Sequence, residues 1–342
     1  MKYPDIIDFR SDTVTKPTKP MLEAMFNAKV GDDVFEEDPT IKALEEKAAS
    51  MFGKEAALFC SSGTMTNQIA IKIQTQPGQE IVFEKDSHVY YAEGGGVAFN
   101  SGLSMRMISG DRGRIKAEDV IENINPDNVH APITSLVSLE NTSNKGGGSC
   151  YDIETIRSIA DACQSHGLKL HLDGARIFNA IIASSYSATE IGKPFDSISV
   201  CLSKGLGAPV GSVLISTKEN IKEARRVRKV FGGGMRQAGF LAAAGIYALD
   251  HNISRLKDDH SRARAIGNTL TKLSFVEEVL PVETNIILFR ITNKISTDDF
   301  INKLAAHNIK AAPFGKQIIR MVTHIEINDD MVEHTLSVLQ KF

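Results

Sequence analysis

The chain has few cysteines and no long hydrophobic run. Its four cysteines, at positions 60, 150, 163 and 201, form no Cys-x-x-Cys pair. Neither a disulfide framework nor a metal site is therefore predicted, and reduced, buried thiols fit a cytosolic protein. The longest uncharged apolar stretch, residues 238–249, is too short to span a bilayer, and the N-terminus lacks the apolar segment of a signal peptide. The sequence predicts a soluble, cytoplasmic protein with no membrane partner.

An excess of charge of one sign is also absent. With 39 basic and 42 acidic residues the formal net charge is -3, which gives no electrostatic reason to expect nucleic acid or an anionic membrane as partner. A small-molecule site is the better expectation. The 342 residues exceed the usual size of one core, and 42% of them are hydrophobic. We expect a large domain over 1–250, including an irregular N-terminal arm, and a long linking helix with a small α+β domain over 251–342.

Strand-like and helix-like segments alternate from about residue 56 to 215. Short apolar strands are expected at 81–83, 134–139 and 168–172, and helices begin after Asp38 and at Asp152. This order predicts an α/β fold whose mostly parallel central sheet is joined by crossover helices. Ligands of such sheets bind beyond the carboxyl ends of the strands, so the polar residues that follow each strand are the candidate site.

Lys204 follows one of these strands. An apolar run from Ser199 ends in Ser203-Lys204, passes through glycines and resumes as a second apolar run to Ile215. Burying an ammonium is costly unless it is paired or loses its charge. Lys204 is therefore either a reactive amine or a strand-end lysine whose long side chain reaches solvent.

Two further strand ends carry candidate ligand groups. Ser62, Gly63 and Thr64 open a helix, where free amides, hydroxyls and the helix dipole suit a phosphate, although serine and threonine also cap helices that bind nothing. His88 lies just past the strand at 81–83, beside a glycine-rich segment. It either stacks on a ligand ring or is a loop histidine with satisfied hydrogen bonds.

Asp173 stands at the end of the strand at 168–172, next to Gly174. A phosphate-binding helix start, a histidine, an aspartate and a lysine at one sheet edge together describe a pyridoxal phosphate site. The protein must hold the phosphate, supply a lysine amine and place an acid on the pyridine nitrogen so that the ring can accept electrons. Asp173 suits the last task.

Long motifs stand in order along nearly the whole chain. They include Arg10-Ser-Asp-Thr-Val-Thr15, Ser62-Gly-Thr-Met65, His171-Leu-Asp-Gly-Ala-Arg176, Leu202-Ser-Lys-Gly-Leu-Gly-Ala-Pro-Val-Gly211, Gly232-Gly-Gly-Met-Arg-Gln-Ala-Gly239 and Arg320-Met-Val-Thr-His324. These motifs resemble those of the L-threonine aldolases, which have the fold type I of the pyridoxal phosphate enzymes, that of aspartate aminotransferase.

The resemblance implies a role for each candidate residue. Lys204 would form the imine with the cofactor, Asp173 would meet the pyridine nitrogen, and His88 would stack on the ring. Ser62, Gly63 and Thr64 would hold the phosphate, helped by a basic residue of a neighbouring subunit, Arg228, Lys229 or Arg236. The substrate carboxylate would be held by Ser11, Arg176 and Arg320, and Arg176 would also lie near the cofactor. His130 would meet the β-hydroxyl.

The resemblance also implies an activity and an assembly. The reaction would be retro-aldol cleavage of L-threonine or L-allo-threonine, a β-hydroxy-α-amino acid, to glycine and acetaldehyde, with His130 or a water as the base. The assembly would be a homotetramer, a dimer of dimers with active sites between subunits. Two alternatives stay open. One is a β-eliminating lyase or an aminotransferase of the same fold, and the other is a cofactor-binding protein without catalysis.

The chain departs from the family pattern at three positions. Ala92 replaces the tyrosine or phenylalanine usual four residues after the stacking histidine, Glu36 replaces a glycine, and Ser143 replaces the histidine of a Glu-Asn-Thr-His motif. Ala92 and Ser143 bear on recognition of the hydroxyl. We therefore predict weak discrimination between configurations at Cβ.

Overall fold

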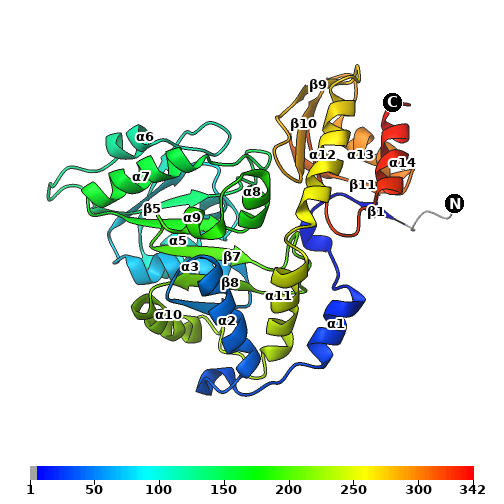
Figure 1. Cartoon of the computed structure of the whole chain (residues 1–342). Coiled ribbons are helices and arrows are strands. Elements are labelled where there is room, and N and C mark those ends of the chain that lie inside the picture. The colour runs from blue at the N-terminus through cyan, green and yellow to red at the C-terminus, as the bar shows by residue number, and fades with distance from the viewer. Residues whose placement is uncertain (1–5) are drawn as a thin grey trace.

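The computed structural model describes residues 6–342 and arranges them as a large and a small unit (Figure 1). The large unit is built on a seven-stranded sheet. Its strands, in spatial order, are β2 (Ala56–Cys60), β8 (Ser212–Ser216), β7 (Ser197–Cys201), β6 (Lys169–Gly174), β5 (Thr134–Glu140), β3 (Glu80–Glu84) and β4 (Ser104–Ile108).

The direction of the strands confirms the mostly parallel sheet. The pairs β7–β6, β6–β5, β5–β3 and β3–β4 are parallel, whereas β8 is antiparallel to β7 and to β2. Because β2 and β7 are both antiparallel to β8, they run in the same direction as the rest. The carboxyl ends of β2, β7, β6, β5 and β3 therefore meet at one edge.

Helices cover both faces of this sheet (Figure 1). One face packs against α3 (Gly63–Gln74), α5 (Gly96–Ser101) and α10 (Lys218–Val230). The other packs against α2 (Pro39–Met51), α7 (Ile153–Ser165), α8 (Ile177–Ala183), α9 (Ala188–Gly192) and α11 (Gly239–His251), with α6 (Ala117–Glu122) beside α7. In β3, Val82 faces one layer while Ile81 and Phe83 face the other, as the period of a strand requires.

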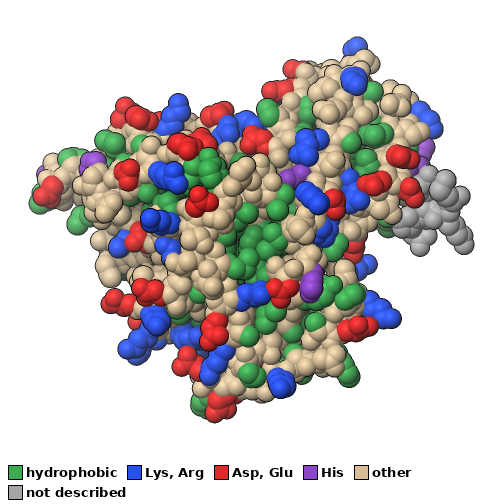
Figure 2. Space-filling view, in the orientation of Figure 1, with side chains coloured by type: hydrophobic (Ala, Val, Ile, Leu, Met, Phe, Trp, Pro, Cys, Tyr) green, Lys and Arg blue, Asp and Glu red, His purple; other side chains and the backbone are tan. Residues whose placement is uncertain are grey.

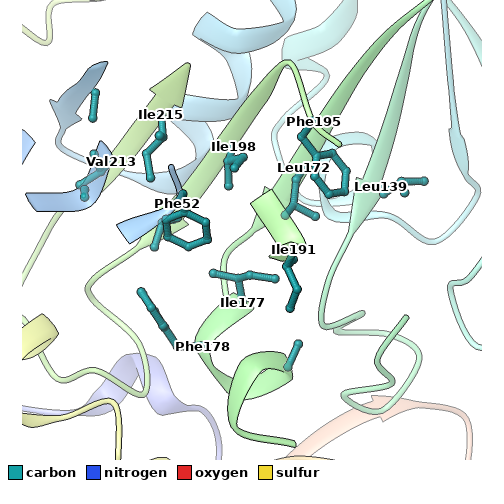
Figure 3. Close-up of a cluster of buried hydrophobic side chains, with 14 of the residues drawn as sticks. Phe52, Leu139, Leu172, Ile177, Phe178, Ile191, Phe195, Ile198, Val213 and Ile215 are labelled. Atoms are coloured by element: carbon teal, nitrogen blue, oxygen red, sulfur yellow. The ribbon is translucent and has the colours of Figure 1, made fainter. Parts of the chain in front are cut away.

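The main core lies between the sheet and the α2–α7–α8 layer, and Figure 3 shows part of it. Leu139, Leu172 and Ile198 project from three adjacent strands and are almost fully buried. Phe52 and Phe178 meet beneath them with ring centroids 5.8 Å apart. This apolar layer fixes the sheet on the side opposite to α3.

The predicted helix starts at Asp38 and Asp152 are confirmed. Asp38 accepts hydrogen bonds from the amides of Thr40 and Ile41, and Asp152 accepts one from the amide of Thr155. Each side chain thus satisfies backbone donors that have no partner inside the helix.

The small unit holds a four-stranded antiparallel sheet and three helices. The sheet has the order β12 (Ala312–Gly315), β13 (Ile318–Val322), β10 (Ile286–Ile291) and β9 (Val276–Val279). It packs against α12 (Leu256–Leu270), α13 (Thr297–Ala305) and α14 (Asp329–Leu339) around a second core. The predicted small α+β part is thus present, and the boundary near residue 250 stays a prediction.

The N-terminal arm contacts both units: its first strand joins the small unit, whereas α1 (Lys19–Phe26) packs against α11 of the large unit and Met21 is buried in the main core. Strand β1 (Ile7–Asp8) pairs in parallel with β11 (Ile309–Lys310), and Figure 1 shows it beside the C-terminal helix. Ile7 and Phe9 are buried in the small core. Residues 1–5 of the arm lie outside the described residues.

Two sequence-based expectations were wrong in detail. The arm is not wholly irregular, because α1 (Lys19–Phe26) forms with Pro20 in its first turn, where proline favours a helix. Instead of one long linking helix, the region holds two helices, α11 and α12, with the chain turning at 252–255. That break lets α12 pass from the large core, through Leu256, to the small one.

Within residues 6–342 no helix is long and apolar enough to cross a membrane. Figure 2 shows charges of both signs spread over the face in view, with hydrophobic side chains gathered near its centre. The small net charge is thus not the sum of two large opposite patches on this face.

Candidate active site

Four predicted residues lie at the carboxyl edge of the large sheet. His88 begins α4 (His88–Tyr91) after β3, Asp173 stands near the end of β6, Lys204 follows β7, and Ser62 precedes α3 after β2. His88 Nδ1 is 4.0 Å from Asp173 Oδ2. The sheet topology therefore brings residues more than a hundred positions apart into one site.

Asp173 is buried and held from two sides. Its Oδ2 accepts a hydrogen bond of 2.9 Å from Asn67 Nδ2, and its Oδ1 accepts one of 3.1 Å from the amide of Ala175. Asn67 lies on α3, one helical turn after Gly63. The carboxylate is thus fixed between the helix and the strand end.

His88 is surrounded by carboxyl groups. Its Nδ1 is 2.9 Å from Glu93 Oε1, and its backbone amide donates to Glu140 Oε2. Burial alone would lower the pKa of His88, but the hydrogen bond that its ring donates to Glu93 and the charges of Asp173, Glu93 and Glu140 outweigh it and raise the pKa. The environment favours the protonated imidazole.

Glu140 ends β5 directly beside Asp173 in the parallel pairing. It accepts hydrogen bonds from the amides of His88 and Asn144, each at 2.9 Å. Burial, and then the charge of Asp173, raise the pKa of Glu140 to about 7. This carboxyl group can hold or release a proton near neutral pH.

The turn before α3 has the form expected of a phosphate-binding helix start. Ser62 Oγ accepts from the amide of Met65, and the amides of Gly63 and Thr64 precede the first intrahelical hydrogen bond, so they are free for a ligand. A Cβ added at Gly63 would lie 2.6 Å from Cys201 Sγ. Only glycine lets the helix start pack this closely on β7.

Lys204 is half-buried, and its Nζ donates to Cys201 Sγ at 3.2 Å. The Thr15 hydroxyl and the amide of Gly207 donate to its carbonyl oxygen. The charge of Lys204 also contributes to lowering the pKa of Asp12. The amine therefore lies among the arm, β7 and the turn before α3.

Arg176 and Asp12 form a buried ion pair beside Lys204. Arg176 Nε and Nη2 donate to the two carboxylate oxygens of Asp12 at 2.8 and 2.6 Å. Burial by itself would raise the pKa of Asp12, but the charge and hydrogen bonds of Arg176 lower it to about 2. Arg176, expected to bind the substrate or cofactor, thus has a partner within the chain, and its contact with a ligand stays a prediction.

Arg320 projects from β13 of the small unit toward the same place. Its Nη1 donates to Asn144 Oδ1 at 2.9 Å and its Nη2 to the carbonyl oxygen of Arg10 at 3.0 Å. Burial, and then the charge of Arg176, lower the pKa of Arg320 to about 10. Ser11, the other expected carboxylate contact, is the neighbour of Arg10 and accepts from the hydroxyl of Thr13.

Several buried polar atoms at this edge have no partner among residues 6–342. They are both side-chain polar atoms of Asn141, the Thr142 hydroxyl and Arg320 Nε. Buried polar groups are normally hydrogen-bonded. Their number here, next to Glu140 and Asp173, fits a polar ligand such as pyridoxal phosphate with an amino acid.

His130 is not brought to this edge. It is exposed and lies before Thr134, the first residue of β5, whereas Glu140 is the last. A strand of this length spans about 20 Å. Within one chain His130 is therefore at the opposite edge from Asp173 and Lys204.

The three basic residues expected near a neighbouring phosphate differ in accessibility. Arg228 is buried, donates to the carbonyl oxygen of Phe59 and pairs with Asp33 at 2.7 Å. These partners within the chain do not favour a contact with another copy, and the role of Arg228 stays a prediction. Lys229 and Arg236 are exposed, and Arg236 pairs with Asp32 at 2.9 Å.

Known proteins are similar in sequence to this chain over nearly its whole length. A family model described as "Beta-eliminating lyase" matches residues 8–294. A probable low-specificity L-threonine aldolase 2 of Arabidopsis thaliana is 42% identical over 342 residues, covering 98% of this chain and 96% of that protein. The low specificity L-threonine aldolase of Escherichia coli K12 is 40% identical over 332 residues, covering 96% of each. The chain belongs to the L-threonine aldolase family.

Solved structures agree on the fold. A Leishmania major threonine aldolase matches with a TM-score of 0.85 at 20% identity, covering 98% of this chain and 99% of that one. A serine palmitoyltransferase variant of S. paucimobilis, with a bound aldimine of pyridoxal phosphate and myriocin, matches with a TM-score of 0.76 at 16% identity, covering 98% of this chain and 86% of that one. The fold is that of the fold type I pyridoxal phosphate enzymes, as predicted.

The three departures from the aldolase pattern have different structural settings. Glu36 has φ of 58°, a left-handed conformation that explains a glycine in the family. Ser143 is buried, accepts from the amide of Gly146 and lies against Gly113, so it closes its own loop. Ala92 follows Tyr91, an aromatic residue one position earlier than the usual one. The centre of the exposed Tyr91 ring lies 3.1 Å from Lys145 Nζ.

The sequence analysis gave no role to four residues of this aldolase site: Asp12, Asn67, Glu93 and His171. His171 was open to discovery, because the period of two in β6 puts it on the face of Asp173, opposite Leu170 and Leu172. Asn67 follows Gly63 by four residues, which places both on one side of α3. Asp12 and Glu93 have no such local signal, since their partners depend on the fold.

Proposed function

We propose that this chain cleaves L-threonine and L-allo-threonine to glycine and acetaldehyde with pyridoxal phosphate as cofactor. The observation that carries this is the gathering of Lys204, Asp173 and His88 at one sheet edge in a chain about 40% identical to L-threonine aldolases. Pyridoxal phosphate, when bound, accepts the electron pair left on Cα as the Cα–Cβ bond breaks.

The residues of the large unit would hold the cofactor. Ser62, Gly63 and Thr64 donate to the phosphate, and Lys204 supplies the amine to which the aldehyde is attached. Asp173, oriented by Asn67 and Ala175, keeps a proton on the pyridine nitrogen. His88 lies against the ring.

The small unit and the arm would hold the substrate. Arg320, with Ser11, binds the carboxylate through charge-assisted hydrogen bonds, using the Nε that has no partner among the described residues. A base then removes the proton of the β-hydroxyl. His130 or a water does this, and Glu140, with its pKa of about 7, is a nearby group that can hold the proton.

An assembly with sites between subunits accounts for His130. Because His130 lies at the opposite sheet edge in its own chain, it can reach a hydroxyl only in the site of a second copy. Lys229 and Arg236 are exposed for contact with a neighbouring phosphate. We infer a cytoplasmic homotetramer, a dimer of dimers, for which light scattering is the measurement and a monomer the contradicting result.

The function is tested with L-threonine and a coupled acetaldehyde assay. We expect acetaldehyde and glycine in equal amounts, and an absorbance band of the bound cofactor that disappears in Lys204→Ala together with activity. Lys257→Ala, which removes an exposed lysine of α12, is the control and should keep both. A band that persists in Lys204→Ala would refute the role of Lys204.

The family model's name favours one alternative, β-elimination. A β-eliminating lyase would release pyruvate and ammonia from L-serine, and an aminotransferase would need a keto acid. Either product pattern, without acetaldehyde from threonine, would replace the proposed reaction.

Discrimination at Cβ is expected to be weak. Ser143 is engaged in its own loop and Ala92 presents no ring, so neither can distinguish the two hydroxyl configurations. Cleavage rates of the four threonine stereoisomers check this. A preference of several hundredfold for one L-diastereomer would contradict it.

A further inference from the structure

Glu93 is a buried carboxylate at the heart of the site that none of the roles above uses. Its side chain is fully buried, and it is 2.9 Å from His88 Nδ1, 2.8 Å from Asn67 Nδ2 and 2.7 Å from Gln68 Nε2. A buried carboxylate is tolerated only when it is paired and hydrogen-bonded. The cationic partner that these contacts provide is His88.

The hydrogen bonds behind Glu93 have a fixed direction. Gln74 Nε2 donates to Ser197 Oγ, and Ser197 Oγ lies 2.7 Å from His171 Nδ1. Burial lowers the pKa of His171 to about 4, so its ring is neutral and has one donor and one acceptor. Asn67 Nδ2 faces two carboxylates, which only accept, so Asn67 Oδ1 faces His171 Nε2 and the proton of the ring is on Nε2. Nδ1 is then the acceptor, and the Ser197 hydroxyl donates to it.

The side chain of Asn67 connects His171 to the two carboxylates of the site. His171 Nε2 is 3.1 Å from Asn67 Oδ1 and donates to it. The amide nitrogen of Asn67 must then point the other way, where its two hydrogens meet Glu93 Oε1 and Asp173 Oδ2 at 2.8 and 2.9 Å. One amide thus ties the two carboxylates together.

The third hydrogen-bond contact of Glu93 is with His88. Glu93 Oε1 accepts from Asn67 Nδ2 and Oε2 from Gln68 Nε2, and because a carboxylate only accepts, the hydrogen of the contact with His88 is on Nδ1. The groups that act on this imidazole are Glu93, Asp173 and Glu140, all acidic.

We propose that Glu93 is a positioning residue that fixes the proton of His88 on Nδ1 and the plane of its ring, and that Asn67 couples it to Asp173. The inference rests on the proposed function, in which His88 lies against the pyridine ring of pyridoxal phosphate. Glu93 touches neither cofactor nor substrate in this proposal and acts through His88 alone.

The test is a pH titration of His88 by NMR in the full-length protein with ¹³C-labelled histidine, free of cofactor and loaded with it. His88→Asn assigns the signal. We expect Glu93→Gln, which keeps the shape but removes the charge, to lower the pKa of His88 by about one unit or more. Glu278→Gln removes an exposed carboxylate on β9 and should leave the titration unchanged.

A second readout is the affinity for pyridoxal phosphate. Glu93→Gln should weaken binding about tenfold, because one charge-assisted hydrogen bond no longer orients the ring of His88. Glu93→Asp keeps the charge and should retain most of the raised pKa, so it separates loss of charge from loss of shape.

An unchanged His88 titration in Glu93→Gln would overturn the proposal, even if the variant were less stable. Should Glu93→Gln fail to fold, Glu93→Asp decides alone: a lower affinity with the raised pKa kept supports positioning, and an unchanged affinity refutes it. If wild-type protein bound no pyridoxal phosphate, the proposed function would fail while the titration would still report on Glu93.

Discussion

Two buried carboxylates beside the site differ in protonation because their neighbours differ. Asp12 faces the guanidinium of Arg176, which lowers its pKa to about 2 despite burial. Glu140 faces the carboxylate of Asp173, and its pKa is raised to about 7. The chain therefore keeps a permanent negative charge next to Arg176 and a titratable proton next to His88.

Two buried histidines make stability sensitive to mild acid. Burial lowers the pKa of His171 and of His260 to about 4 each, from 6.5. Below pH 6.5 these histidines bind protons in the unfolded chain but not in the folded one. The free energy of unfolding is therefore highest above pH 6.5 and decreases as the pH falls to about 4. We expect a loss of about 2 kcal/mol for each histidine between pH 7 and pH 5, measured by urea unfolding.

His260→Gln isolates the contribution of one histidine to this loss. The glutamine amide can still donate to Asn179 Oδ1, which His260 Nε2 contacts at 2.9 Å, but it does not titrate. The variant should lose less stability than the wild type over this range. An identical loss in both would show that His260 does not cause it.

At the scale of elements, Asp38 connects three segments. Its Oδ1 caps α2, while its Oδ2 accepts from the amide of Gly31 in the arm and from that of Gly239 at the start of α11. A Cβ at Gly239 would meet Asp38 within 2.4 Å. This side chain is thus a junction as well as a helix cap.

Asp38→Ala should destabilise the protein by about 2–4 kcal/mol, because the cap is lost and further buried donors lose their acceptor. Asp152→Ala is the matched control. It also removes an aspartate cap, but an exposed one that serves α7 alone, so a cost of about 1 kcal/mol is expected. Equal costs in denaturant unfolding would mean that Asp38 acts only as a cap.

Local signals explain which elements could be predicted. Aspartate before a periodic apolar segment predicted α2 and α7, and apolar runs predicted β3, β5 and β6. Helix α1 was not predicted, because proline interrupts a helix at most positions, whereas Pro20 stands in the first turn. The break between α11 and α12 has no clear local signal, since it follows from packing on two cores.

The site was predictable where residues follow strands, and not where they pair across the fold. Lys204, Asp173, His88 and Ser62 each follow a strand, so topology alone places them at one edge. Asp12 and Arg176 are 164 positions apart, and the sequence around neither residue indicates that the two form an ion pair. His130 precedes β5 rather than following it, so the sheet topology does not place it at this edge within one chain, and its role stays a prediction.

For the whole molecule, the position of His130 predicts complementation between subunits. A mixed oligomer of Lys204→Ala and His130→Asn chains would contain sites with Lys204 from one chain and His130 from the other. Refolding the two variants together should restore activity above that of either alone. Activity equal to the average of the separate variants would show that His130 does not act in a second copy.

Exposed aromatic residues agree with such an assembly. Phe26, Phe35 and Phe99 are 84%, 71% and 90% exposed in the single chain. Scattered exposed hydrophobic residues are common, and aromatic residues are enriched in interfaces between subunits, so these rings are candidates for such contacts.

The pairing of β1 with β11 also determines which parts of the fold can form first during synthesis. Ile7 and Phe9 are synthesised well before their strand partner at 309–310. The large sheet, complete by residue 216, can form earlier. Until residues 309–310 and the strands after them are made, β1 has no strand partner and Arg320 is missing. A growing chain can therefore gather Lys204 and Asp173 without being able to close the substrate side of the site.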